Sequence, residues 1–596
     1  MPAYAVFVAT FATYAWTASP AMGWLDSPEF VATGASLGVA HSPGHPLAGL
    51  LGRLATLLPA GDMAFRVNLL SALCGALAAV AVYCAARALL SRVAPSFEAP
   101  SSEIAAAAIA LAVALSWAAW FQGVRAEVYA LEAALLGGAL AALLTWDRRR
   151  EPRFLIVAGL LCGLGLAHHH LITLLFLLPA GAFVLLRGRA ERPSVRVAGA
   201  TALCGVLGLA ALLYLPVRAA AHPEVNWGDP QTFERFAWTV SAQAFHKSAG
   251  GDHVSSAAQD TAEIVATLLE QATPLLLLAA LLGAYLGLRR AGHRRVILLL
   301  LGIATLSAAG RVSLGFDPGT PDHYAYLWPA IVAIALLGLA GLAQLAHLLS
   351  GESPGIVAVL VAVVAAAIVP WQVATHAQAS KLDDAYASDT LARAELDALP
   401  PRTVVLVGYF QTSFRLWALR AVEEARPDVV VLDRSFLTYP GFAAVARERY
   451  PDLVAVIDAP LRAGAPTPVD LLRALDRPIA IQLHINLDEA PRSSLIPRGL
   501  YAWLQPERAT REQREAAEPL DAAERHRIDA LLAPAAIGDA AGIRDDLLWL
   551  DFLRIDFYCS MGRRDAALRA LESARRAAPD DAMLTELAKQ CGITAP

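Results

Sequence analysis

The stretch WLDSPEFVATGASLGVAHSPGHP (residues 24–46) decides what kind of protein this chain is. It places two carboxylates, two histidines and three prolines between one apolar run and the next. A segment that only links two membrane spans has no structural need for so many polar and rigid residues. Such groups are costly near lipid unless they line a wet cavity or bind a molecule. We therefore expect a functional site here, just after a membrane span.

The composition around this stretch is that of a membrane protein. Of 596 residues, 57% are hydrophobic and only 17% are charged, which is too apolar for an ordinary soluble enzyme. Long uncharged runs continue to about Trp371 and then give way to a conventional mixture. A membrane span needs about 20 apolar residues. We predict eleven spans, near residues 3–19, 66–90, 104–121, 128–146, 154–168, 170–186, 197–218, 272–288, 295–312, 325–349 and 355–373.

The arginines indicate how these spans are oriented. If the N-terminus is cytoplasmic, the loops on the outer side carry only Arg53, Arg125, Arg235 and Lys247, with Arg66, Arg218 and Arg311 at span edges. The inner turns carry many more: Arg92, Arg148, Arg149, Arg150, Arg153, Arg187, Arg189, Arg192, Arg196, Arg289, Arg290, Arg294 and Arg295. Positive residues favour the cytoplasmic side. This bias predicts an inside N-terminus, with residues 24–46, the 219–270 loop and the C-terminal third all outside.

The part of the chain after Trp371 has the pattern of a folded extramembrane region. Strands are expected at 403–408, 429–433 and 479–485, with helices between them, which predicts a small α/β unit with a mainly parallel sheet. No glycine-rich phosphate fingerprint follows the first strand, so nucleotide binding is not expected. The stretch from Gly562 to Pro579 resembles one tetratricopeptide helix pair, which we expect to pack on the α/β unit. The predicted domains are 1–374, transmembrane; 375–515, extracytoplasmic α/β; and 516–596, helical and tetratricopeptide-like.

Six cysteines do not form a disulfide framework. Four of them fall in apolar spans, where a small buried side chain is the ordinary role. Cys559 and Cys591 lie near the C-terminus, and the sequence leaves open whether they pair. The chain contains no CxxC motif and no histidine or cysteine spacing that is typical of a metal site.

Helix-start signals account for one of the two carboxylates in residues 24–46. Ser27 suits an N-cap, Pro28 the first helical position and Glu29 the first turn, so a helix start explains Glu29 without any chemistry. It does not explain Asp26, which lies just outside the helix, directly after an apolar run. Asp26 is therefore the stronger candidate for a chemical role.

Other polar motifs stand at the predicted mouths of spans. The apolar stretch 154–186 would be about 50 Å long as one helix. We expect it to break at the triple histidine His168–His170, which would then lie in a cavity below the outer surface. A metal site there is the weaker alternative, because adjacent histidines in one helical turn do not converge on one ion. The remaining motifs are AHSPGHP (40–46), FRVNLLSAL (65–73), RAEVYALEA (125–133), NWGDPQTFERF (226–236), FDPGTPDHYAYLWP (316–329) and SSLIPRGLYAWLQP (493–506).

Together these motifs resemble, best over residues 20–240, a bacterial multipass membrane family related to the eukaryotic transmembrane protein O-mannosyltransferase of plexin-type IPT domains. That family belongs to the GT-C class of polyprenyl-phosphate-dependent glycosyltransferases. The family has His-Pro-Pro-Gly-Tyr-Pro where this chain has residues 41–46, so His41 keeps its place while Ser42 and His45 depart from the pattern. The resemblance implies a helical GT-C-like membrane fold in the bacterial cytoplasmic (inner) membrane.

The resemblance also implies which carboxylate does the chemistry. The catalytic acidic residue of GT-C enzymes lies in the first external loop, soon after the first span, which points to Asp26 as general base and to Glu29 second. A serine or threonine hydroxyl is a poor nucleophile until a positioned carboxylate removes its proton. One carboxylate is enough in a single inverting displacement, because a phosphate leaving group needs little protonation. Glycoside hydrolysis, in contrast, uses a pair of carboxyl groups.

The other candidates each have a structural alternative. Arg66 either snorkels to the membrane interface or binds a phosphate. Glu127 either contacts substrate or interacts with a helix dipole. Trp227 and Asp229 either shape a sugar or acceptor subsite or turn their loop. The arginines predicted to hold the donor phosphate are Arg66, Arg125, Arg218 and Arg311. The full set of predicted substrate-binding residues is His41, His45, Arg66, Asn68, Arg125, Glu127, Tyr129, His168, His169, Arg218, Trp227, Asp229, Arg311 and His323, with Asp322 beside the last.

The function implied is transfer of a sugar, mannose by resemblance, from a polyprenyl-phosphate carrier to a hydroxyl on the outer side of the membrane. The partners would be membrane lipid, the lipid-linked sugar, and an acceptor protein or glycolipid, and no nucleic acid is expected. No cofactor is expected, and the need for a divalent metal stays open. Two rival functions are a transporter or flippase of lipid-linked glycans, for which the sequence shows no inverted repeat, and a non-enzymatic membrane scaffold.

Overall fold

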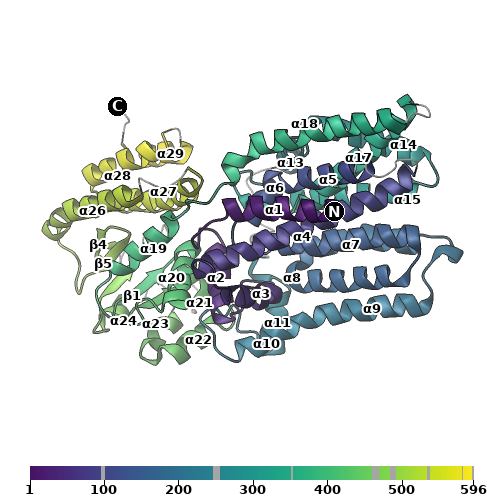
Figure 1. Cartoon of the computed structure of the whole chain (residues 1–596). Helices are drawn as coiled ribbons and strands as arrows, with labels where there is room; N and C mark the ends of the chain where they lie inside the picture. The colour runs from purple at the N-terminus through teal and green to yellow at the C-terminus, as the bar shows by residue number, and fades with distance from the viewer. Residues whose placement is uncertain are drawn as a thin grey trace.

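The computed structural model describes residues 1–95, 101–245, 256–350, 354–459, 469–482, 492–532, 537–579 and 581–593. Long helices lie side by side in a bundle, and a smaller lobe that contains the strands sits at one end of it (Figure 1). We call the elements from α19 onward the C-terminal lobe. The short helices α2 (Ser27–Ser36) and α3 (Pro46–Thr56) lie between the bundle and this lobe.

The bundle is built from apolar helices that share a buried core rich in alanine, leucine and valine. Small residues let some of these helices approach closely, because a β-carbon at Gly208 would lie only 2.6 Å from the backbone nitrogen of Leu164. The helices of the bundle are α1 (Pro2–Thr17), α4 (Met63–Val93), α5 (Ser101–Ala114), α6 (Trp117–Gly123), α7 (Tyr129–Arg149), α8 (Pro152–Leu185), α9 (Val195–Leu209), α10 (Tyr214–Ala219), α13 (Ala257–Ala272), α14 (Pro274–Arg289), α15 (Arg294–Ser313), α17 (Trp328–Ser350) and α18 (Pro354–Ser380).

Within the described residues, six helices are long and apolar enough to cross a membrane, and eight are counted if two bent helix pairs are each one span. The chain is therefore a multipass membrane protein, but the predicted number of eleven spans is not confirmed. Two predicted spans, 154–168 and 170–186, are the two halves of α8. The predicted first span is α1, whose 16 residues fall short of the about 20 that a perpendicular crossing requires.

The predicted break in the long apolar stretch is confirmed. α8 has 34 residues, and His169 within it has non-helical backbone angles (φ −141°, ψ 80°) that kink the helix. A 34-residue straight helix would be far longer than the bilayer core is thick. The kink also carries His168 and His169 toward the short helices α2 and α3, as the ring contacts below show.

A cluster of charged side chains joins the helix ends that lie at the turns rich in arginine. The Arg187 guanidinium lies 2.6 Å from the Asp147 carboxylate, and both side chains are buried. Arg92 and Arg150 contact the same carboxylate at 3.6 Å, and Arg295 pairs with Glu191. The ends of α4, α7 and α8 and the start of α15 are therefore held together at one end of the bundle.

The C-terminal lobe contains a five-stranded sheet with the order β2-β1-β3-β5-β4. Its first three strands in this order are parallel, while β5 pairs antiparallel with both β3 and β4. The sheet is therefore mixed, and the prediction of a mainly parallel sheet is corrected by the β4–β5 hairpin. The sequence PRGL (497–500) forms the end of β4 and the turn of this hairpin. The strands are β1 (Val404–Val407), β2 (Val430–Asp433), β3 (Ile479–Ile481), β4 (Leu495–Arg498) and β5 (Tyr501–Leu504). The predicted third strand extends into residues 483–485, which lie outside the described residues.

Alternate side chains of β1 point to opposite faces, as a strand requires, and both faces are buried. Val405 and Val407 share a core with α2, α19 and α20, whereas Val404 and Leu406 share one with α27 and α28. The C-terminal helices therefore pack on the sheet as expected. The helices of the lobe are α19 (Ala387–Asp397), α20 (Phe410–Glu423), α21 (Arg434–Leu437), α22 (Phe442–Arg449), α23 (Val454–Asp458), α24 (Val469–Arg473), α26 (Arg511–Leu532), α27 (Ile537–Ser560), α28 (Arg564–Ala577) and α29 (Ala582–Gln590).

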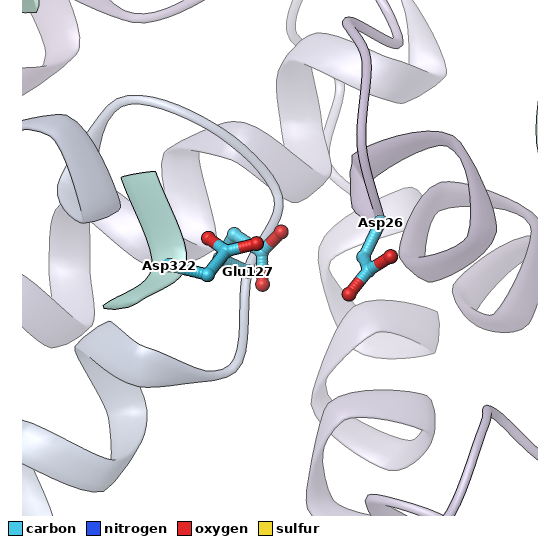
Figure 2. A group of neighbouring side chains, drawn as sticks. All are labelled: Asp26, Glu127 and Asp322. Atoms are coloured by element: carbon cyan, nitrogen blue, oxygen red, sulfur yellow. The ribbon is translucent and has the colours of Figure 1, made fainter. Parts of the chain in front are cut away.

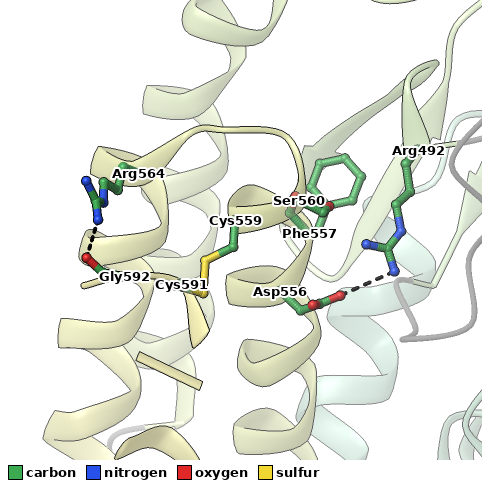
Figure 3. Close-up of a disulfide and its surroundings, with 8 residues drawn as sticks. All are labelled: Arg492, Asp556, Phe557, Cys559, Ser560, Arg564, Cys591 and Gly592. Atoms are coloured by element: carbon green, nitrogen blue, oxygen red, sulfur yellow. Dashed lines mark hydrogen bonds and ion pairs between the residues drawn. A yellow bond between two sulfur atoms is a disulfide. The ribbon is translucent and has the colours of Figure 1, made fainter. Parts of the chain in front are cut away.

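Cys559 and Cys591 form a disulfide, which settles the question that the sequence left open (Figure 3). The bond joins the last turn of α27 to the residue after α29, with the two Cα atoms 5.5 Å apart. Arg564 donates to the carbonyl oxygen of Gly592 beside it, and the Arg492 guanidinium lies 3.3 Å from the Asp556 carboxylate. The last helices of the chain are thus fastened to one another covalently.

Candidate active site

Asp26 stands at the N-terminal end of α2, where the chain leaves the segment after α1. It occupies the N-cap position that the sequence suggested for Ser27, and its carboxylate makes no capping hydrogen bond to the helix. Pro28 and the acidic Glu29 occupy the first turn as expected. The Asp26 side chain keeps 25% of its surface exposed. The oxygens of a capping carboxylate are occupied by backbone N–H groups, whereas those of Asp26 can accept hydrogen bonds from a bound molecule.

Glu29 has a different environment from Asp26. Its side chain is fully buried, and both of its carboxylate oxygens contact His41. The backbone N–H of His41 donates to Oε1 at 2.7 Å, and Nδ1 of the His41 ring lies 2.6 Å from Oε2. Nε2 of the same ring lies 3.9 Å from the Asp26 carboxylate. Glu29 thus fixes His41, and His41 in turn faces Asp26.

These contacts shift the pKa values of the two groups that face each other. Burial raises the pKa of Asp26 to about 6, against the opposing effect of His41, and the carboxylates of Asp322 and Glu29 add to the rise. Burial lowers the pKa of His41, but the carboxylates of Glu29 and Asp26 outweigh it and raise that pKa to about 9. His41 is therefore a cation at neutral pH, placed between two carboxyl groups.

Arg125 joins two further carboxylates to this site. Its guanidinium donates to Oε1 of Glu127 at 2.8 Å and also to the carboxylate of Asp322. It also donates to the Ser27 hydroxyl at 3.3 Å and to Oε1 of Gln122 at 3.1 Å. Arg125 is only 2% exposed, so these bonds form away from bulk water. Charge-assisted bonds of this kind fix three segments relative to one another: the start of α2, the loop before α7, and the first turn of α16 (Pro321–Ala325), which contains Asp322.

Three carboxylates therefore converge from distant parts of the sequence. Asp26 lies on one side of the site, and Glu127 and Asp322 lie next to each other on the other side (Figure 2). One oxygen of each lies within 4.8 Å of the others, a spacing that a divalent cation with oxygen ligands can bridge. Arg125 already pairs with two of the three. A cation at this place would have to displace or join that guanidinium.

A group of aromatic rings lies behind His41. The His45 ring is 4.9 Å from that of His41 and 5.6 Å from that of His168, between ring centres. His169 lies 5.9 Å from His45 and 5.6 Å from Tyr129. Burial and the neighbouring histidines lower the pKa of His45 well below its usual value, so its ring is neutral. The structure thus brings His168 and His169 to the turn at residues 41–46.

The other predicted arginines, and Asn68, bind backbone carbonyl oxygens. Arg66 donates to the carbonyls of Thr56, Ala60 and Gly61, and Arg218 donates to those of Ser36 and Leu37. Arg311 donates to the carbonyls of Leu314 and Gly315 and lies over the Tyr326 ring. The amide of Asn68 donates to the carbonyls of Ser19 and Ala21. These side chains fix the loops around the site, and their predicted contact with a donor phosphate stays a prediction.

The last three candidates lie at the edges of the site. Trp227 is buried against Phe436 and Phe442 of the C-terminal lobe, with its ring 6.1 Å from that of His41. Asp229 accepts bonds from Asn226 and Gln231 and pairs with Arg235, so it organises its own loop. His323 accepts from the backbone N–H of Asp317, and burial lowers its pKa to about 4. It is Asp322, rather than His323, that joins Arg125.

Known proteins resemble this chain over part of its length. Residues 26–194 match the family model described as "Protein O-mannosyl-transferase TMEM260 N-terminal domain". This confirms the family resemblance. The matched segment begins at Asp26 and includes His41, Arg125 and Glu127, and ends before the C-terminal lobe. The mouse protein O-mannosyl-transferase TMEM260 is 27% identical over 460 residues, which are 73% of this chain and 63% of the mouse protein. The match therefore spans less than two thirds of that relative.

Solved structures give the fold. The crystal structure of ArnT from Cupriavidus metallidurans in the apo state aligns with a TM-score of 0.51 and 13% identity, over 84% of this chain and 97% of ArnT. ArnT bound to undecaprenyl phosphate aligns with a TM-score of 0.46 and 13% identity, over 72% of this chain and 88% of that one. The first of these alignments shows that the chain shares the helical membrane fold of ArnT.

Some residues of the site carried little signal in the sequence. Asp322 stood out only as a polar residue at a span mouth, with no indication that it would meet Arg125. Gln122 lies inside an apolar run, where an isolated amide is the only signal. Gln411, which contacts the backbone of Leu25 at 3.1 Å, belongs to a helix of the extramembrane lobe and had no signal at all.

Proposed function

We propose that this protein is an integral membrane glycosyltransferase. It would move a sugar, mannose by its resemblance, from a polyprenyl-phosphate donor to a hydroxyl group of an acceptor protein on the outer side of the membrane. The observation that carries this proposal is the Asp26 carboxylate, which caps nothing, is partly exposed and faces His41 and a paired cluster of charged groups. The name of the mouse relative supports mannose and a protein acceptor.

Asp26 would act as general base in a single displacement. As the acceptor hydroxyl attacks the anomeric carbon, its proton passes to the Asp26 carboxylate. The bond between the sugar and the phosphate oxygen breaks on the opposite face, and the electron pair leaves with the phosphate. The product would have the inverted anomeric configuration. The cations His41 and Arg125 would stabilise the negative charge that develops as the phosphate leaves.

The buried histidines support a sugar subsite next to Asp26. Among the residues that the structure describes, Nδ1 of His45, of His168 and of His169 is buried and has no hydrogen-bond partner. A buried polar atom without a partner costs free energy. Hydroxyl groups of a bound sugar would supply the missing bonds, and neutral imidazole rings are suited to exchange hydrogen bonds with them.

Two observations support an extracytoplasmic site in a cytoplasmic membrane. Disulfides persist in oxidising compartments, which favours an external C-terminal lobe because this lobe contains the Cys559–Cys591 bond. The arginine-rich cluster around Asp147 joins helix ends at the turns predicted to be cytoplasmic. Asp26 and the C-terminal lobe lie together, since α2 packs on α20.

The donor assay tests this function. Purified protein in detergent would be incubated with a polyprenyl-phosphate sugar or the matching nucleotide sugar, and with acceptor proteins from a strain that lacks the gene. We expect transfer from the lipid-linked donor alone, with inversion of the anomeric configuration measured by NMR. Robust transfer from the nucleotide sugar alone would contradict the proposal. Labelled glycolipid in place of labelled protein would assign the acceptor to lipid.

A further inference from the structure

The segment that leads to Asp26 is held by two side chains of the C-terminal lobe. The backbone N–H of Leu25 donates to Oε1 of Gln411 at 3.1 Å, and that of Met22 donates to Oδ1 of Asp389 at 3.0 Å. Gln411 lies in the first turn of α20 and Asp389 in the first turn of α19. Both bonds cross from the membrane bundle to the lobe. The backbone on the N-terminal side of Asp26 is therefore pinned from outside the bundle.

The bond to Leu25 holds a conformation that leucine does not favour. Leu25 has φ of 56°, in the left-handed region, where a side chain with a β-carbon crowds the backbone. Such a residue persists only where its surroundings hold it. The next residue is Asp26, so a change in the backbone angles of Leu25 would swing the Asp26 carboxylate directly. The hydrogen bond from Leu25 to Gln411 thus acts on the position of the base.

Gln411 is itself fixed by the sheet of the lobe. Its Nε2 donates to the Tyr409 hydroxyl at 3.0 Å, and the backbone N–H groups of Gly408 and Tyr409 donate to Oε1 of Gln482. Gln482 is buried at the end of β3 and donates to the Thr412 hydroxyl at 3.0 Å. A chain of hydrogen bonds therefore runs from β3 through the start of α20 to the backbone beside Asp26.

The residues after Asp26 are held by the same lobe. Phe30, Val31 and Ala32 of α2 are buried in one core with Phe414 and Leu419 of α20. Asp26 thus lies between a backbone hydrogen-bonded to the lobe and a helix packed against it. A precise carboxylate position requires support of this kind from rigid elements.

We infer that Gln411 is a positioning residue for Asp26, and that the C-terminal lobe completes the active site through its bonds to Leu25 and Met22. This inference rests on the proposed function in one respect, that Asp26 is the base. It goes beyond that function in making the lobe a part of the catalytic machinery, as opposed to a separate acceptor-binding or scaffold module.

The first test is Gln411→Ala in the full-length protein. Misplacement of a catalytic group by about 1 Å costs up to about 100-fold in rate. We expect kcat for sugar transfer to fall by about 10- to 100-fold, with little change in KM for the lipid-linked donor. Gln513→Ala is the matched control, because Oε1 of Gln513 also accepts a backbone N–H bond in the same lobe, at 2.8 Å from the nitrogen of Thr510. Equal losses in the two variants, or an unchanged kcat in Gln411→Ala, would overturn the inference.

A rescue experiment separates positioning from a general loss of stability. Glycine reaches φ near 56° without the crowding that leucine suffers, so the loop can return to this conformation even when the bond to Gln411 is lost. We expect the double variant Gln411→Ala with Leu25→Gly to recover part of the kcat that Gln411→Ala loses. A double variant that is no more active than Gln411→Ala, although it elutes as a folded protein, would speak against positioning through Leu25.

Hydrogen exchange tests the same contact without any activity. We expect the peptide that covers residues 22–28 to be protected in the wild-type protein and in Gln513→Ala, and to exchange faster in Gln411→Ala. Unchanged exchange in Gln411→Ala would overturn the inference. If this peptide responds as expected while no preparation transfers sugar, the positioning of the loop stands and the proposed function fails.

Discussion

The imidazole of His41 links two carboxylates at the start of α2: Nδ1 lies 2.6 Å from the buried Glu29 and Nε2 lies 3.9 Å from the carboxylate of Asp26. The two acidic residues that the sequence placed three positions apart thus have different roles. Glu29 holds the His41 ring, and Asp26 remains partly exposed. Because His41 contacts both carboxylates, replacing it tests whether their different environments matter for sugar transfer.

Replacing His41 by glutamine should slow transfer without unfolding the protein. Glutamine keeps polar atoms near Glu29 but removes the positive charge and the ring that faces Asp26. Hydrogen bonds to charged groups contribute about 1.5–3 kcal/mol, which corresponds to a fall of about 10- to 100-fold in kcat. Steady-state kinetics of the purified variant would check this. A variant with the wild-type kcat would show that His41 has no part in the reaction.

Removing Arg125 should destabilise the protein more than removing an exposed arginine. Arg125→Ala leaves Glu127 and Asp322 without their shared cation, and breaking a buried ion pair in this way costs about 3–5 kcal/mol. We expect a clear fall in the melting temperature of the detergent-solubilised protein. Arg148→Ala, at an exposed position on the opposite end of α7, is the control. Equal melting temperatures for the two variants would contradict the packing described here.

Chelation should leave the transfer rate unchanged. The Arg125 guanidinium already neutralises two of the three carboxylates that lie within 4.8 Å of one another. The measurement is the initial rate before and after treatment with EDTA, together with the metal content of the purified protein. A loss of activity that Mn²⁺ or Mg²⁺ restores would assign a divalent cation to Asp26, Glu127 and Asp322 instead.

The predicted orientation of the chain in the membrane determines at which positions a fused reporter will be active. A reporter enzyme that folds only outside the cytoplasm should be active when fused after Trp371, and inactive when placed in the turn at residues 147–153. A fluorescent reporter that folds only in the cytoplasm should give the reverse pattern. If the C-terminal lobe proved cytoplasmic, Asp26 would face the wrong compartment for the proposed donor, because α2 packs on that lobe.

Local features of the site were predictable because they depend on neighbours in the sequence. The start of α2 at Ser27, with Glu29 in its first turn, follows from short-range signals, and the break at His169 follows from the length of an apolar run. The first two strands of the lobe likewise match their apolar segments. The β4–β5 hairpin was missed, since two four-residue strands, one of which contains Pro497, give a weak pattern.

Long-range contacts were not predictable in the same way. Arg125 meets Asp322 across 197 positions, and Gln411 meets Leu25 across 386, so no motif contains either pair. The arginines at span mouths illustrate a second limit. A sequence shows that Arg66 and Arg218 carry charge, but only the fold shows that backbone carbonyls accept their hydrogen bonds.

The most direct measurement is the initial rate of sugar transfer by Asp26→Asn. This change keeps the size of the side chain and removes the proposed base, for which the expected loss is about 10²- to 10⁴-fold. Asp62→Asn is the matched control, because Asp62 is also an N-cap aspartate without a capping hydrogen bond, exposed at the start of α4. Glu29→Gln should lose less than Asp26→Asn. The account predicts that Asp26→Asn folds but does not transfer sugar while Asp62→Asn is fully active. A tolerated Asp26→Asn together with total loss in Glu29→Gln would contradict it.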